Sequence, residues 1–125
     1  YAALEVNMRP SGGCSTDMMN YAGGTDVYAI WADMIAGNVP RAVCGQKSFC
    51  VYVGRRRGKS YALSRAEILV RYGSHLKEYG DVDGALAPAM GDERYLACFD
   101  TEEEAYAFFG ETTRAPGEPL RDDCA

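Results

Sequence analysis

The chain has 125 residues, of which 47% are hydrophobic and 25% charged, which suits a single domain with a modest core. Its formal net charge of −5 argues against a general nucleic-acid or membrane-surface binder, because phosphate contacts need a basic face. No apolar run approaches the ~20 residues that a membrane-spanning helix needs. Five dispersed cysteines and one histidine do not supply the four clustered ligands of a zinc site, and unpaired thiols favour a cytoplasmic location.

Residues 4–9 alternate between apolar and polar side chains, as a strand with one buried face does. Glu5, Asn7 and Arg9 share the polar face. Neighbours on one face lie roughly 6.5–7 Å apart, so a carboxylate and an amide oxygen can both reach one Mg2+ ion. The planar guanidinium of Arg9 can hold a phosphate or a carboxylate beside them. On spacing alone, an edge strand with a solvated polar face is the simpler interpretation.

Residues 4–13 (LEVNMRPSGG) resemble the last metal-binding strand of ATP-grasp ligases. The resemblance implies that Glu5 and Asn7 bind the Mg2+ ions of ATP, and that Arg9 contacts the transferred phosphoryl group or the acyl-phosphate. It continues through residues 23–28 (GGTDVY), which are similar to the opening of the following helix in that family. It covers the first 40 residues well and is looser beyond them.

The loop after this strand supplies further candidates for substrate contact. Gly12 and Gly13 allow backbone conformations closed to other residues, so they either form a simple turn or let substrate approach the backbone. The ATP-grasp resemblance places this loop beside the acceptor substrate. It therefore adds Ser11, Cys14 and Ser15 as weaker substrate contacts.

Two helices are expected next. The first starts at a cap on Ser15 or Thr16 and ends at the glycine pair 23–24. Its expected inner residues are Met18, Met19 and Ala22. Thr25 is the expected cap of the second helix, which Gly37 ends. Apolar residues at helical spacing predict a buried face for it: Val27, Ile30, Trp31, Met34 and Ile35.

From residue 41 the pattern changes to that of strands and turns. Residues 48–53 alternate and predict a strand. Residues 54–59 (GRRRGK) then form a basic turn, and residues 61–63 return as a second strand. The arginines of this turn are able to meet the phosphates of a nucleotide or an acidic substrate, although a solvated hairpin tip is the simpler interpretation. The spacing of a Walker phosphate-binding loop is not met.

Ser64 and Glu67 have the spacing of a capping box and predict a helix that runs to about Tyr72. The short segment that follows contains His75, the chain's one histidine. A lone histidine beside a turn is more often structural than catalytic.

Residues 85–90 and 94–99 predict two strands joined by a turn, with Pro88 placing the first at an edge or a bulge. Asp100 or Thr101 then caps a last helix, whose first turn holds three glutamates. Its expected buried stripe, before an end at Gly110, consists of Ala105, Phe108 and Phe109. This hairpin and helix resemble the closing segment of some ATP-grasp carboxylate–amine ligases, including peptide ligases.

These elements predict an α/β or α+β fold with about five strands and four helices, antiparallel in its second half because the connections are short. Residues 1–40 are expected to be the end of an ATP-grasp domain, residues 41–110 an appended hairpin-and-helix unit, and residues 111–125 a flexible tail. Because a strand begins almost at Tyr1, we expect the chain to be the C-terminal part of a longer polypeptide. Upstream ATP-grasp subdomains of that polypeptide would complete the ATP site.

The resemblance implies an ATP-dependent carboxylate–amine ligase, with ATP and Mg2+ as cofactors and an acyl-phosphate intermediate. Its partners would be small-molecule carboxylate and amine substrates, with a homodimer left open, and this part alone would be inactive. One alternative is another ATP-grasp reaction, of the carbamoyl-phosphate synthase type. Biotin carboxylation is disfavoured, because residues 10–13 (PSGG) replace the Gln-Val-Glu-His run usual in carboxylases. The other alternative is a non-catalytic binding domain, in which Glu5 and Arg9 are solvated charges.

Overall fold

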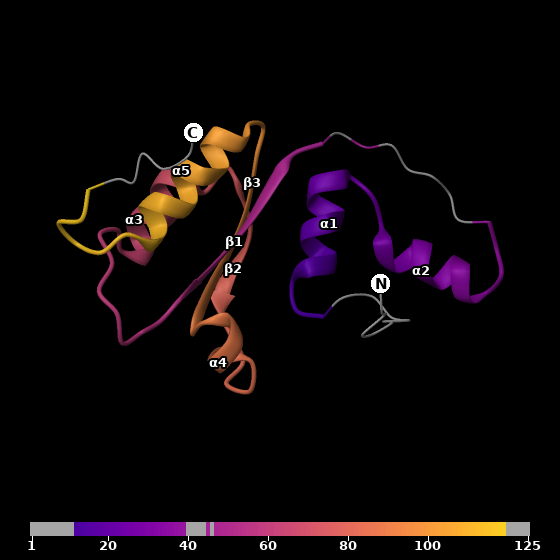
Figure 1. The fold of residues 1–125 in the computed structure, drawn as a ribbon, viewed down its shortest axis with the longest axis horizontal. Coiled ribbons are helices and arrows are strands. Elements are labelled where there is room, and N and C mark those ends of the chain that lie inside the picture. The colour runs from indigo at the N-terminus through magenta and orange to yellow at the C-terminus, as the bar shows by residue number, and fades with distance from the viewer. Residues whose placement is uncertain (1–11, 40–44, 46, 120–125) are drawn as a thin grey trace, which may run out of the picture. The chain divides into compact units, whose positions relative to one another are not determined.

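The computed structural model of the chain describes residues 12–39, 45 and 47–119 (Figure 1). The chain divides into two compact units, residues 1–47 and residues 48–125. Within the described ranges there are five helices and three strands, so the fold is mixed α and β as predicted. None of the helices in these ranges combines the length and apolar character that a membrane crossing requires.

The first unit contains two described helices, α1 (Ser15–Gly23) and α2 (Val27–Ile35). Gly24 ends α1 with a φ of 60°, the left-handed conformation that a glycine adopts without strain. Asp26 caps α2, because its carboxylate accepts a hydrogen bond from the Ala29 amide at 3.0 Å.

The predicted caps of both helices are wrong by one residue. Cys14 takes the N-cap position of α1 without a side-chain hydrogen bond, so Ser15 is already helical. Asp26 rather than Thr25 caps α2, because Asp26 has the extended backbone that directly precedes the first helical residue.

The predicted burial of the apolar face of α2 is also wrong. Trp31, Met34 and Ile35 are 38%, 62% and 66% exposed, and α2 contains no buried residue. Met19 of α1, expected to face inward, is 51% exposed. Helical spacing sets which side chains share a face but does not supply an element to cover it. In the described part of this unit, α1 is the only other helix.

The second unit is built on three strands, β1 (Phe49–Arg55), β2 (Leu76–Asp81) and β3 (Glu93–Phe99). They form an antiparallel sheet in the order β1-β3-β2. Helix α3 joins β1 to β2, α4 joins β2 to β3, and α5 follows β3; their bounds are Arg65–Tyr72, Ala87–Met90 and Glu102–Thr113. Because β1 and β2 are both antiparallel to β3, they are parallel to each other, and β1-α3-β2 is a split β-α-β unit.

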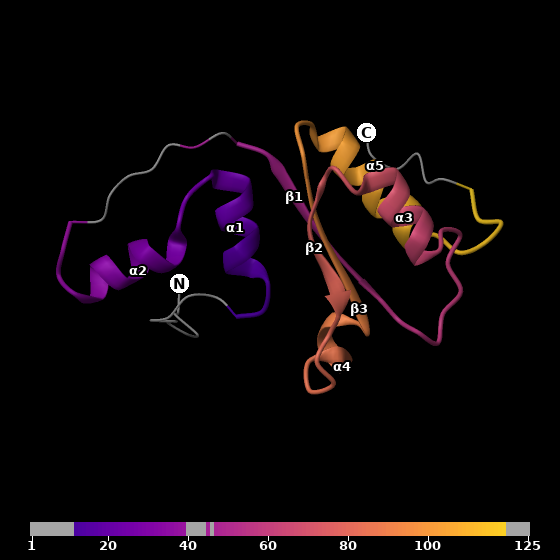
Figure 2. The same ribbon diagram turned by 180° about the vertical axis from the view of Figure 1, so that it is seen from behind.

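Helices α3 and α5 lie side by side over one face of the sheet in both views (Figures 1 and 2). Capping boxes start both helices, at Ser64 with Glu67 and at Thr101 with Glu104. The core under them is fully buried and draws on two strands and two helices: Val53, Ile68, Tyr95, Ala97, Phe99, Ala105 and Phe108. The alternation predicted for β1 and β3 is confirmed, because Val53, Tyr95 and Ala97 lie on the face of this core; Leu96 and Cys98 of the other face are buried too.

Several predictions for the second unit are wrong. Residues 85–90 do not form a strand; α4 occupies the last four of them, and Pro88 lies in its first turn, where the missing N–H costs nothing. Residues 61–63 are not a strand either. The segment after His75 is strand β2, which was not predicted.

The last helix is longer and differently rotated than predicted. It continues through Gly110 to Thr113, and Thr112 rather than Phe109 completes its buried face. Residues 114–119 are not a loose tail, because the carbonyl of Arg114 accepts a hydrogen bond from the Ala62 amide at 2.9 Å.

Candidate functional site

The predicted metal and phosphate ligands lie outside the described residues. These are Glu5, Asn7 and Arg9, together with Ser11 of the adjoining loop. Within residues 12–39, 45 and 47–119, no three His, Cys, Asp or Glu side chains are grouped so that they could hold a metal ion. The described residues begin at Gly12, in the segment that directly follows the predicted strand.

That segment is a turn that leads straight into α1. Gly13 has a φ of 67°, which favours glycine, so the turn interpretation accounts for this residue. Cys14 is 7% exposed, and its carbonyl accepts the Met18 amide at 2.9 Å. Ser15 is half-buried and Gly12 is exposed. The geometry thus fixes Cys14 inside the unit and leaves Gly12 and Gly13 as the exposed members of the predicted substrate loop.

The corner between α1 and α2 is fixed by backbone and side-chain hydrogen bonds. Asn20 accepts the Val27 amide on its side-chain oxygen at 2.7 Å, and its carbonyl accepts the Thr25 amide at 3.3 Å. The backbone of Gly45 packs directly against that of Gly24 at this corner. A Cβ added to Gly45 would lie only 2.7 Å from the Cα of Gly24, so a larger residue does not fit there. The roles of Asn20 and Gly45 were not predicted; a mid-helix asparagine before a Gly-Gly pair was the one available signal.

A tyrosine–aspartate hydrogen bond joins the two helices. The hydroxyl of Tyr28 donates to Asp17 Oδ1 at 3.2 Å. Desolvation and this hydrogen bond raise the pKa of Tyr28 above its ordinary value. The pair connects α1 and α2, and the tyrosine keeps its proton at neutral pH.

The basic turn of the second unit is solvated at its tip, as its sequence predicted, because Arg57, Gly58 and Lys59 are exposed; Arg55, which precedes the tip, is not. Arg55 is the last residue of β1 and is only 6% exposed. Its Nη2 donates to the Leu63 carbonyl at 2.7 Å, and its guanidinium lies 4.0 Å from the centre of the Tyr61 ring. Its Nε and Nη1 are buried and have no hydrogen-bond partner among the described residues.

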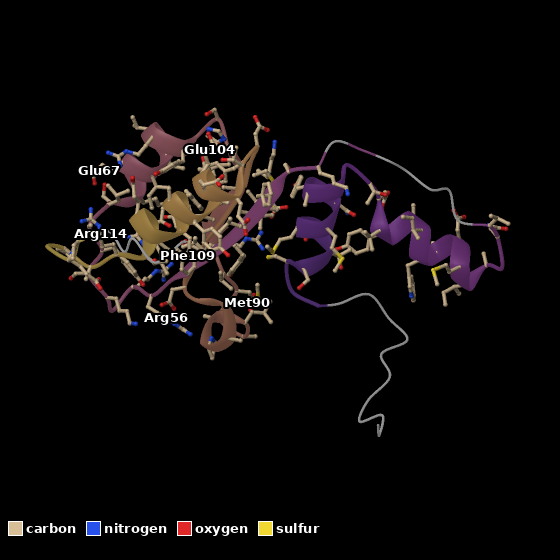
Figure 3. The ribbon with its side chains drawn as sticks, turned by 45° about the horizontal axis from the view of Figure 1, so that its top comes forward. Arg56, Glu67, Met90, Glu104, Phe109 and Arg114 are labelled. Carbon is tan, nitrogen blue, oxygen red and sulfur yellow. The ribbon has the colours of Figure 1, made fainter. Side chains whose placement is uncertain are left out.

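The next two arginines contact other groups of the protein, and Arg56 is labelled in Figure 3. Arg56 donates to the carbonyls of Ala87 and Pro88 at 2.5 and 2.6 Å, so it fastens α4 to the end of β1. Arg57 forms an ion pair with Asp81 at 3.2 Å. A role in gripping phosphate would require these arginines to exchange existing partners.

Two cysteines lie opposite each other in the sheet, at Cys50 of β1 and Cys98 of β3. His75 lies beside them: its Nδ1 is 3.3 Å from the Cys98 carbonyl oxygen, and its ring stacks on Phe99 with centroids 4.7 Å apart. These contacts account for His75 as a structural residue. Neither the cysteine pairing nor the histidine contact was predicted, because both arise from the register of β3 against its neighbours.

No protein-family model, curated protein or solved structure matches the chain. Function is therefore argued from the residues of this chain.

Proposed function

We propose that the chain is part of an ATP-dependent carboxylate–amine ligase of the ATP-grasp type. The observation that carries this proposal is the row Glu5, Asn7 and Arg9, followed by the Gly12–Gly13 pair. A carboxylate and an amide are both oxygen donors, which is the donor set that Mg2+ takes. An arginine on the same face of the strand is suited to phosphate or acyl-phosphate oxygens.

Each residue of the row has a distinct role in this proposal. Glu5 and Asn7 would hold Mg2+, which when bound with ATP offsets charge on the phosphate oxygens. Arg9 would orient and stabilise the phosphoryl or acyl-phosphate oxygens as preorganised positive charge. The left-handed turn at Gly13 supports a fixed geometry for the loop that follows the row. Which carboxylate and which amine react is set by residues outside this row.

The proposal is tested in the full-length polypeptide by measuring ADP release with a panel of amines. Glu5→Gln keeps the size of the side chain and replaces a charged metal ligand by a neutral amide, so the rate should fall by more than about 100-fold while far-UV circular dichroism stays unchanged. Glu103→Gln, at an exposed position in the first turn of α5, is the matched control and should keep the rate. Normal ADP release by Glu5→Gln would refute the metal assignment.

Arg9→Lys separates charge from geometry, because lysine keeps the charge and loses the planar fork. A clear loss of turnover, with Mg2+-ATP binding retained, is expected if Arg9 acts on the phosphoryl group. Near-normal turnover would remove that role from Arg9 and leave Glu5 and Asn7 to be judged separately.

A second candidate, a non-catalytic interaction domain, is favoured by the exposed apolar side chains of α2. Tyr28, Trp31, Met34 and Ile35 are between 38% and 66% exposed, and contiguous exposed apolar surface is typical of a binding face. The intact mass of the natural polypeptide discriminates the two candidates. A product of several hundred residues favours the ligase, whereas one of 13.6 kDa favours the interaction domain.

A further inference from the structure

Cys50 and Cys98 are a cross-strand pair on the face of the sheet opposite the helices. The register of β1 against β3 sets them directly opposite each other. Val53 and Ala97 belong to the core under α3 and α5, and side chains alternate along a strand. The two thiols therefore project from the other face, on the same side as each other.

The backbone makes this a closely spaced pair. The Cys98 amide donates to the His75 carbonyl at 3.0 Å, so the hydrogen-bonding groups of Cys98 point away from β1 and toward the β2 side. Cys50 and Cys98 are consequently a non-hydrogen-bonded pair, the type in which opposite Cα atoms approach to about 4.5 Å. Disulfides form at Cα separations of about 4.4–6.8 Å, so the backbone of this pair needs no large movement to be bridged.

The side chains are also in contact range. Burial, followed by a hydrogen bond with the Cys98 thiol, raises the pKa of Cys50 to about 12. On β2, Lys77 opposes this pKa shift and Glu78 adds to it. Cys50 is half-buried and Cys98 is 8% exposed, so Cys50 is the more accessible sulfur.

We propose that Cys50 and Cys98 form a redox site, which closes to a cross-strand disulfide when a small-molecule disulfide such as oxidised glutathione is the oxidant. The Cys50 sulfur, as thiolate, attacks one glutathione sulfur and releases the other as a thiolate. The Cys98 sulfur then attacks Cys50 in this mixed disulfide and releases the second glutathione. Two protein thiols are oxidised, one glutathione disulfide is reduced to two thiols, and the two cysteine protons end on the released glutathione sulfurs.

The site differs from a reactive surface thiol in the rates of its two steps, which follow from the burial of Cys50 and from its closeness to Cys98. Attack is slow at neutral pH because the thiolate is scarce, and the second step is fast because the resolving sulfur is already adjacent. The mixed disulfide should therefore not accumulate. This inference does not depend on the proposed ligase, since it uses only residues of the three-stranded sheet.

The test uses the full chain with the three other cysteines, Cys14, Cys44 and Cys124, changed to serine. The folded chain is equilibrated in buffers of reduced and oxidised glutathione, quenched with acid, and analysed by intact mass and non-reducing peptide mapping. A product that has lost two hydrogens, carries no glutathione and links the peptides of Cys50 and Cys98 is expected. Two thiols that remain free in fully oxidised buffer, or a product that stops with glutathione attached, would overturn the proposal.

Two controls keep the result interpretable. In the same background, Cys98→Ser removes the resolving thiol, so oxidation should stop at Cys50 with one glutathione attached, and a chain that takes up no glutathione would remove the attacking role from Cys50. The unsubstituted chain, mapped after oxidation when folded and again in denaturant, should link Cys50 to Cys98 when folded and lose this preference when unfolded. Equal mixtures of pairings in both states would show that the sheet does not direct the bond.

Discussion

Phe108 and its neighbour Phe109 provide a direct test of how α5 is rotated on the sheet. Phe108 is completely buried, and its ring lies 4.9 Å from that of Tyr72 and 5.3 Å from that of Phe99, centroid to centroid. Phe109 is 47% exposed (Figure 3). Phe108→Ala should lower the free energy of unfolding by about 3–5 kcal/mol, whereas Phe109→Ala should cost less than about 1 kcal/mol.

The measurement is urea unfolding of the chain followed by far-UV circular dichroism. The only tryptophan, Trp31, lies in the first unit, so its fluorescence is a poor probe of the sheet. If Phe108→Ala leaves too little folded protein to measure, Phe108→Leu keeps most of the volume and should fall between Phe108→Ala and Phe109→Ala in stability. Equal losses for Phe108→Ala and Phe109→Ala, or a larger loss for Phe109→Ala, would mean that α5 is rotated differently from the structure described here.

Two further predictions use the sheet and its helices. Gly54→Ala should lower the free energy of unfolding by about 1–3 kcal/mol, because the added Cβ would overlap the Met90 carbonyl oxygen. Gly110→Ala in α5 has free space for a Cβ and should raise the free energy of unfolding by about 0.5–1 kcal/mol. Urea midpoints that do not separate in this order would contradict both assignments. Burial, then hydrogen bonds to carboxylates, raise the pKa of Tyr72 and of Tyr95 from 10.0 to about 12. Unfolding therefore releases protons between pH 10 and 12, so stability is full below pH 10 and falls as pH rises to 12; Tyr72→Phe should flatten this fall in thermal melts, and an unchanged slope would refute it.

Local signals explain which parts of the fold could be predicted. The helices that start at Ser64 and Thr101 were predicted because a capping box is a short-range pattern that the final structure keeps. Strands β1 and β3 were predicted from alternation, which reports burial of one face. Both kinds of signal lie within a few residues of the element that they define.

Elements whose state depends on distant partners were missed or misread. Strand β2 has a polar, glycine-containing sequence with exposed Tyr79, and it is a strand because it pairs with β3. Pro88 predicted an edge strand, although proline is also common in the first turn of a helix, which is where it lies in α4. The exposed apolar face of α2 has the same cause, since helical periodicity identifies which side chains share a face and does not identify the element that covers them.

The candidate sites follow the same division. The row Glu5, Asn7 and Arg9 is visible in sequence because its members are two residues apart, the spacing that places side chains on one face of a predicted strand. The Cys50–Cys98 pair is separated in sequence and becomes visible only through the register of two strands. Arg55 was expected in solvent because it belongs to a run of three arginines, yet its position at the end of β1 turns it toward Tyr61.

Arg55 also shows how the structure separates a structural charge from a ligand-binding one. A buried guanidinium whose Nε and Nη1 have no hydrogen-bond partner among the described residues is costly, so an apolar side chain of similar length should be tolerated at this position. Arg55→Met should therefore be at least as stable as Arg55→Lys, which keeps the buried charge and loses the flat contact with Tyr61. Urea midpoints decide the order. If Arg55→Lys retains the stability and Arg55→Met loses several kcal/mol, the positive charge itself stabilises the fold, and the argument from its burial is refuted.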